Sequence, residues 1–225
     1  MLSPNSKTYL QAYNTKQGKS IPLFIMQKLI QWITSTYQIA PLTAVYETPI
    51  EYRGNAPRLT IIFEHPEDQN VLLNKNGFTE NQIKKLSILK KFISLVNELN
   101  LQNKYDTQSL FIVYDNFSDS FKSICLQKII YKEKGEKIIR NKFPELNLLS
   151  FITYHYCLII FLETENDLKD AANNGTTNRI KKSLYDLIKK HDLFNYISFN
   201  DFPVHFDSKE NLDKKYGGSM RAYFD

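Results

Sequence analysis

The chain has 225 residues, of which 42% are hydrophobic and 24% are charged, and its formal net charge at pH 7 is +5. Fifteen phenylalanines and fourteen tyrosines supply large core side chains, which excludes a disordered chain. Two cysteines are too few for a disulfide framework or a zinc site, and the composition excludes a coiled coil and a collagen.

The first half of the chain alternates short apolar segments with one long helical pattern. A strand is predicted at Thr8–Tyr13, followed by a buried helix at Pro22–Tyr37 with Ser20 as its N-cap. Further strands are expected at Thr43–Tyr52 and Leu59–Glu64. The remaining predictions are a helix at Thr79–Leu99 that opens with a Thr79/Gln82 capping box, and a hairpin of Leu110–Asp115 and Ser123–Tyr131.

The second half continues in the same style. The patterns predict helices at Glu136–Lys142 and Asn178–His191, and strands at Ile152–Glu163, Phe202–Phe206 and Ser219–Phe224. Asp207 and Glu210 form a capping-box pattern at the start of a short helix, and Gly217 is expected to end that helix.

Two segments of the chain resemble each other. Residues 61–86 read IIFEHPEDQNVLLNKNGFTENQIKKL, and residues 159–184 read IIFLETENDLKDAANNGTTNRIKKSL. Ile61/Ile159, Phe63/Phe161 and Gly77/Gly175 share one offset, and a one-residue gap then aligns Ile83-Lys84-Lys85 with Ile180-Lys181-Lys182. The pattern predicts an internal duplication, because one such unit cannot bury its sheet face alone.

We therefore predict an α+β fold. One mixed or mostly antiparallel sheet is built from two duplicated strand–helix–strand units, with helices packed on one side and an additional N-terminal helix. The chain is expected to form a single compact domain with two related halves, 1–134 and 135–225.

One hypothesis for chemistry is a nucleotide site at Gly18, Lys19 and Ser20, completed by Asp115. A glycine-Lys-Ser turn between a strand and a helix binds phosphates in P-loops, and an Asp after an apolar strand assists magnesium binding. Tyr13 stands where the motif requires its first glycine, and the alternative is a plain turn before a capped helix.

A second hypothesis is a metal site. In a strand, Asp201, His205 and Asp207 point to one face, and a histidine with two carboxylates can bind a divalent cation. The alternative is an ordinary strand with its polar face in water, in which Asp207 acts as a helix cap.

A third hypothesis is nucleic-acid binding by the basic middle of the chain. Residues 75–142 contain thirteen basic and seven acidic side chains. Lys84, Lys85, Lys91 and Arg140 are the candidate phosphate contacts. The alternative is a solvated basic face.

The preferred function is a non-catalytic, cytoplasmic binding protein that recognises another protein, of the adaptor or toxin-neutralising immunity type. It needs no cofactor and has no membrane span, since the longest apolar-rich stretch is Leu149–Leu162. Nucleic-acid binding and a nucleotide- or metal-dependent enzyme remain alternatives, and the sequence sets no oligomeric state. The candidate contact residues are Tyr216, Met220, Arg221 and Tyr223.

Overall fold

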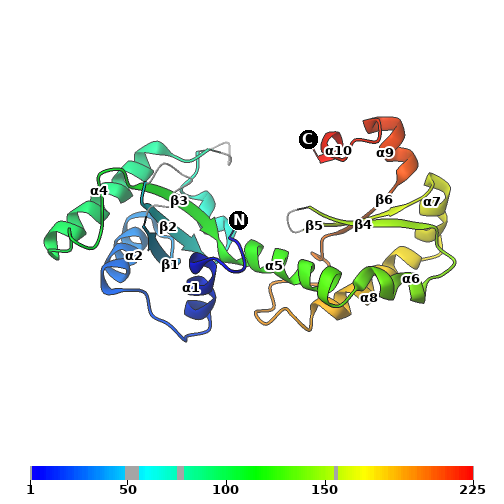
Figure 1. The fold of residues 1–225 in the computed structure, drawn as a ribbon, viewed down its shortest axis with the longest axis horizontal. Helices are drawn as coiled ribbons and strands as arrows, with labels where there is room; N and C mark the ends of the chain where they lie inside the picture. Colours follow the sequence, from blue (N-terminus) through cyan, green and yellow to red (C-terminus); the bar gives the residue numbers. More distant parts are fainter. Residues whose placement is uncertain (1, 49–55, 75–78, 155–156, 225) are drawn as a thin grey trace. The chain divides into compact units, whose positions relative to one another are not determined.

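The structure is a computed structural model that describes residues 2–48, 56–74, 79–154 and 157–224 (Figure 1). It confirms the α+β class, but the strands form two three-stranded sheets in place of one. The chain divides into two compact units, residues 1–120 (unit 1) and 121–225 (unit 2). The division lies inside helix α5 (Phe117–Gln127), earlier in the chain than the expected boundary at 134/135.

In unit 1, two helices precede the first strand in sequence, and two more come between the second and third strands. In its sheet, β1 pairs with β2 in antiparallel fashion and β2 pairs with β3 in parallel. Helices α2 and α4 bury Leu29 and Phe92 against strand residues such as Ile61 in one apolar core, and α1 packs against β1. The elements are α1 Lys7–Lys16, α2 Phe24–Tyr37, β1 Pro41–Glu47, β2 Arg58–Phe63, α3 Pro66–Asn70, α4 Gln82–Glu98 and β3 Phe111–Asn116.

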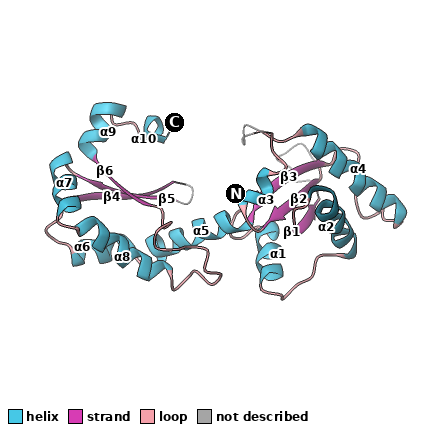
Figure 2. Cartoon of the chain, turned by 180° about the vertical axis from the view of Figure 1, so that it is seen from behind, coloured by secondary structure: helices cyan, strands magenta, loops and turns pink. Residues whose placement is uncertain are grey.

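Unit 2 repeats this order. Its sheet also has one antiparallel pair, β4 with β5, and one parallel pair, β5 with β6. Helices α6 and α8 lie on one side of the sheet, and α9 and α10 lie on the other (Figure 2). The elements after α5 are the π-helix η2 Lys128–Lys132, α6 Gly135–Lys142, β4 Leu148–Tyr154, β5 Cys157–Leu162, α7 Glu165–Asn173, α8 Thr176–Ile188, β6 Val204–Ser208, α9 Lys209–Tyr216 and α10 Met220–Phe224.

The two units are duplicates in topology and register. Each first strand has its irregularity at the same place, between Pro41 and Thr43 in β1 and between Leu148 and Ser150 in β4. In each unit the chain forms a strand, a second strand antiparallel to it, two helices, and a third strand parallel to the second. A shared β-bulge position is a specific feature of a fold, so these coincidences support the duplication predicted from the sequence.

The carboxyl ends of the parallel strands repeat the same backbone contacts. In unit 1 the amide of Ser118 donates to the carbonyl oxygen of Glu64 at 3.0 Å, and in unit 2 the amide of Glu210 donates to that of Glu163 at 3.3 Å. An aspartate is the penultimate residue of each third strand, Asp115 in β3 and Asp207 in β6, and the residue after it caps the next helix. The aspartate carboxylate accepts the next residue's amide, at 2.9 Å for Asp115 and 2.7 Å for Asp207.

The pairing of the two copies differs from the sequence alignment. The strand registers match Phe63 with Leu162, so Ile61 corresponds to Ile160, one residue beyond the predicted partner Ile159. The helix alignment was also wrong, because Ile83 is 81% exposed whereas Ile180 is buried. Gly77 lies outside the described residues.

Several segments predicted as strands are helices. Residues 8–13 lie in α1, whose N-cap Ser6 accepts a hydrogen bond from the amide of Tyr9. Residues 123–131 lie in α5 and η2, and residues 220–224 form α10. The predicted strand at 152–163 is a hairpin of β4 and β5. Short apolar segments fit both periodicities, and tertiary packing decides between them.

The caps show both confirmed and wrong predictions. Asn81 caps α4 in place of Thr79, and Ser208 caps α9 in place of Asp207. The cap of α2 is Leu23, not Ser20. Gly217 ends α9 with a left-handed φ of 59°, as predicted.

Candidate functional site

The residues of the nucleotide hypothesis lie in a different context from the one they need. Gly18 has a φ of +69° in the turn that follows α1, so a helix precedes it where a P-loop has a strand. The hydroxyl of Ser20 lies 3.3 Å from that of Thr15. Lys19 is exposed. Asp115 is the penultimate residue of β3, from which the chain continues into α5 and not into a hairpin.

The two aspartates of the metal hypothesis are occupied by contacts with neighbouring side chains. Asp201 precedes β6 and accepts a hydrogen bond from the hydroxyl of Ser198 at 2.6 Å. His205 is exposed on β6. Asp207 accepts hydrogen bonds from the Asn211 amide group at 3.0 Å and from the Tyr223 hydroxyl at 2.8 Å. Within the described ranges, no three His, Cys, Asp or Glu side chains lie together in a way that could hold a metal ion.

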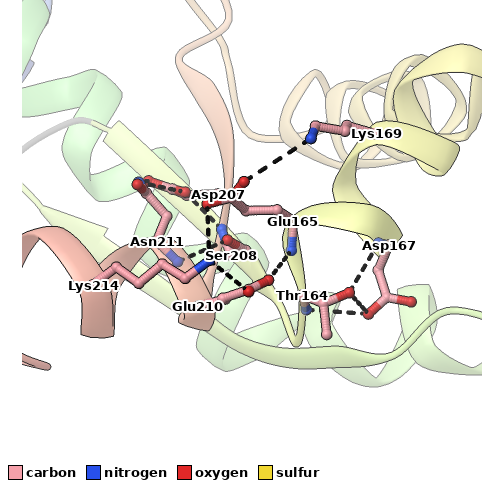
Figure 3. Close-up of polar contacts among 9 residues, drawn as sticks. All are labelled: Thr164, Glu165, Asp167, Lys169, Asp207, Ser208, Glu210, Asn211 and Lys214. Atoms are coloured by element: carbon pink, nitrogen blue, oxygen red, sulfur yellow. Dashed lines mark hydrogen bonds and ion pairs between the residues drawn. The ribbon is translucent and has the colours of Figure 1, made fainter.

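Figure 3 shows why this edge of unit 2 is polar. The Thr164 hydroxyl accepts a hydrogen bond from the amide of Asp167, whose carboxylate in turn accepts one from the amide of Thr164. The Thr164 hydroxyl also donates to the Asp167 carboxylate at 2.7 Å, and this hydrogen bond, with those from the Asn147 side chain and the Thr164 amide, holds the pKa of Asp167 below its ordinary value. The Glu210 carboxylate accepts a hydrogen bond from the backbone amide of Glu165 at 3.0 Å and forms an ion pair with the Lys214 Nζ atom at 2.7 Å. The carboxylates therefore cap helices and pair with lysines, which is a structural role.

The four candidate nucleic-acid contacts are all engaged within the protein. Lys84 donates to the carbonyl oxygen of Val71, and Lys85 pairs with Glu80. Lys91 lies 3.9 Å from Glu98. Arg140 lies in the other unit, where it pairs with Glu136 and donates to the carbonyl oxygens of Leu148 and Leu149.

The candidate contact residues near the C-terminus form part of a small core. Tyr216, Met220 and Tyr223 pack against Ile159 and Phe161, which β5 presents on one face of its sheet. Arg221 is exposed on α10.

Unit 1 contains a pocket that the sequence did not reveal. It has a volume of about 390 Å³ and lies between α1, the turn that joins α1 to α2, strand β1 and the segment that joins α4 to β3. Among the described residues, its lining includes no Asp, Glu, His or Cys. The residues that decide its chemistry are Lys7, Ile21, Leu23, Tyr46, Lys104 and Tyr105.

One wall of the pocket is aromatic and fixed. The rings of Tyr46 and Tyr105 meet edge to face with their centroids 5.0 Å apart. The Tyr46 hydroxyl donates to the carbonyl oxygen of Asp106 at 3.2 Å and accepts from the Asp106 amide at 2.9 Å. Burial raises the pKa of both tyrosines, so they are neutral at physiological pH.

The mouth of the pocket is apolar and exposed. Ile21 is 79% exposed and Leu23 is 66% exposed, and the neighbouring Phe24 is 61% exposed. The turn that presents them is tied to α2, since the Gln27 amide group donates to the carbonyl oxygen of Pro22 at 2.7 Å. Single exposed apolar residues are common, but three close in sequence at a concave site are characteristic of binding surfaces.

The charge around the pocket is positive. Among the described residues, neither Lys7 nor Lys104 has a carboxylate partner. By contrast, Lys16 on the same helix as Lys7 pairs with Glu64. The pocket therefore combines apolar and aromatic surface with uncompensated cations.

Comparison of the chain with protein-family models, with curated proteins and with solved structures finds no match. Among the described residues, no helix combines the length and the apolar character needed to cross a membrane.

Proposed function

We propose that this protein is a non-catalytic binding protein, and that unit 1 recognises another protein by taking an apolar side chain into its pocket. The single observation that carries the proposal is the exposed apolar mouth, formed by Ile21 and Leu23, of a pocket walled by tyrosines. Aromatic and apolar residues that fill or line a concave site contribute most of the binding energy at protein interfaces.

The charge defines the partner further. Lys7 and Lys104 lie at the pocket without carboxylate partners among the described residues, so a partner segment with Asp or Glu beside its apolar residue would complement them. Such a segment suits the adaptor or immunity role expected from the sequence. Among the described residues, the titratable side chains of the lining are those of two lysines and two tyrosines, and the tyrosines are neutral. This composition favours binding over catalysis.

Selection from a random peptide library displayed on phage tests the proposal with the full chain as bait. We expect the enriched peptides to share one large apolar residue flanked by Asp or Glu. Leu23→Asp and Lys104→Glu should each weaken a selected peptide at least tenfold. Leu193→Asp is the matched control, because Leu193 is 62% exposed in unit 2, and it should leave binding unchanged.

Two results would overturn the proposal. One is enrichment of peptides that bind Leu23→Asp as well as the parent chain, and the other is a failure to enrich any peptide over the Leu23→Asp bait. Arg221→Glu in the same assay tests the C-terminal surface, and a loss of binding there alone would move the interface to α10. Circular dichroism of each variant checks that it is folded.

A further inference from the structure

Unit 2 carries a basic surface that lies within the basic middle of the chain but consists of lysines other than the candidate contacts Lys84, Lys85 and Lys91. Four lysines of η2 and the start of α6 are exposed, and none has a carboxylate partner among the described residues. We call this surface the η2 patch, and it consists of Lys128, Lys132, Lys134 and Lys137 together with Tyr131.

The acidic residues within the η2 patch segment are engaged elsewhere. One Glu133 carboxylate oxygen lies 3.1 Å from the Nε2 atom of His191. The carboxylate of Glu136 accepts hydrogen bonds from Arg140, at 2.8 Å and 3.0 Å. The charges of the four lysines are therefore not neutralised by their sequence neighbours.

The backbone that carries these lysines is fixed. Gly135 approaches the π-helix so closely that a Cβ atom there would lie 2.8 Å from the carbonyl oxygen of Ile129. Lys134 has a left-handed φ of 53°, an unusual conformation for a residue with a long side chain. Arg140 ties α6 to β4 through the carbonyl oxygen of Leu149 at 2.7 Å. Backbone strain of this kind persists where the surrounding structure imposes it, and it is concentrated at functional sites.

The surface is also hollowed and bears an exposed aromatic ring. A cavity of about 340 Å³ is lined by Ile130, Lys134, Glu136, Lys137, Arg140 and Asn141, in which the carboxylate of Glu136 pairs with Arg140. Tyr131 is 73% exposed. Its position inside a π-helix is notable, because π-helices are rare and frequently occur at functional sites.

We propose that the η2 patch binds single-stranded nucleic acid. The lysines would contact successive phosphates and Tyr131 would stack on a base, the combination that sequence-tolerant single-strand binders use. An acidic protein would also be attracted by the lysines. The exposed ring of Tyr131 favours nucleic acid, because every base offers a face on which the ring can stack. This inference concerns unit 2 and does not rest on the peptide pocket of unit 1.

Fluorescence anisotropy of a labelled oligo-dT of twelve nucleotides, titrated with the full chain, tests this proposal. If four phosphates are neutralised, affinity should fall about 50-fold between 50 mM and 200 mM salt, because the logarithmic slope for single strands is about −0.7 per contact. The double variant Lys132→Gln/Lys137→Gln should bind more weakly and have a shallower slope. Tyr131→Ala should weaken binding about 5- to 100-fold with little change in slope.

The matched control is Lys182→Gln/Lys209→Gln, which removes the same charge from two lysines of unit 2 that pair with Asp186 and Asp213. It should bind almost as well as the parent chain. An equal loss in the control would show attraction by net charge only, and unchanged binding by Tyr131→Ala would remove the stacking contact. A polyglutamate peptide that binds as tightly as oligo-dT would assign the patch to an acidic protein. Each of these three results would overturn the proposal.

Discussion

The two units share their strand order and register but close the second face of their sheets differently. In unit 1, helix α1 comes before the sheet in sequence and packs against β1. In unit 2, helices α9 and α10 come after the sheet and cover Ile159 and Phe161 with aromatic residues (Figure 2). The same sheet can therefore be completed from either end of the chain.

The strand residues on this second face also differ between the units. The registers place Thr60 of β2 at the position of Ile159 in β5, and both are buried. The Thr60 hydroxyl has no hydrogen-bond partner in the described part of the chain, and the same is true of Thr8 and Thr43. At the position of Thr60, unit 1 thus buries a hydroxyl where unit 2 buries hydrocarbon, and the duplicated fold accommodates both.

The two candidate surfaces also arise from non-equivalent segments. The pocket of unit 1 uses α1, the exposed turn after it and the edge strand β1. The η2 patch of unit 2 uses the π-helix and α6. The pocket therefore includes strand residues and the segment between α4 and β3, whereas the η2 patch lies entirely in the segment that precedes its sheet.

The largest expected effect comes from the loop before β6. Asp192 is buried, and its carboxylate accepts the amides of Tyr196 and Ile197 at 3.0 Å each and pairs with Lys189 at 3.1 Å. Asp192→Ala would leave two amides without an acceptor, so we expect the free energy of unfolding of unit 2 to fall by about 3 kcal/mol. Urea unfolding followed by circular dichroism measures this loss.

Each unit has its own probe for that experiment. The single tryptophan, Trp32, reports on unit 1. Cys125 reports on unit 2, because burial raises the pKa of its thiol to about 12 and it reacts with a thiol reagent only when unit 2 opens. Asp192→Ala should speed the labelling of Cys125, whereas Asp186→Ala, which removes an exposed ion pair with Lys182, should change stability by less than about 0.5 kcal/mol. An equal shift in the Trp32 transition would show that the units do not unfold separately.

An intermediate effect is expected from the tail of unit 2. The Tyr223 ring lies 5.6 Å from that of Phe161, and its hydroxyl donates to Asp207 at 2.8 Å. Tyr223→Ala should lower the free energy of unfolding by about 2 kcal/mol, since the ring is half-buried. Tyr223→Phe keeps the ring and should cost only about 1 kcal/mol.

The comparison of these two variants separates packing from hydrogen bonding. If Tyr223→Phe costs as much as Tyr223→Ala, the hydroxyl contact with Asp207 holds the tail and the ring contributes little. If neither variant shifts the urea transition, α10 does not close the sheet of unit 2.

Much of the fold could be read from the sequence because the duplication repeats strongly apolar strands. Residues 61–63 and 159–161 both read Ile-Ile-Phe, which identified β2 and β5. The predicted alignment of the two helices failed because an Ile-Lys-Lys triplet occurs in both, yet Ile83 of α4 is exposed and Ile180 of α8 is buried. A local match cannot tell which apolar residue faces a core.

The pocket of unit 1 escaped prediction for a related reason. Leu23 fits the apolar periodicity of α2 and was expected in the core, but the helix begins at Phe24 and Leu23 is 66% exposed. The signal in the sequence was the apolar pair Ile21 and Leu23 on either side of Pro22, because a proline favours an extended conformation for the residue before it. The lysines of the pocket come from distant segments, and only the fold brings them to one site.

The most direct test of equivalence between the units is an exchange of side chains at one buried position. Thr60→Val removes a buried hydroxyl that has no partner in the described part of the chain and keeps the shape of the side chain. It should raise the free energy of unfolding of unit 1 by about 1 kcal/mol, measured by Trp32 fluorescence in urea. The reciprocal change, Ile159→Thr, buries a new hydroxyl under Leu212 and should lower the stability of unit 2 by about 2 kcal/mol. Opposite signs are required if the two positions are equivalent, because each variant then adopts the chemistry of the other copy. If Thr60→Val instead lowers the free energy of unfolding, the Thr60 hydroxyl stabilises unit 1. The two positions are then not equivalent.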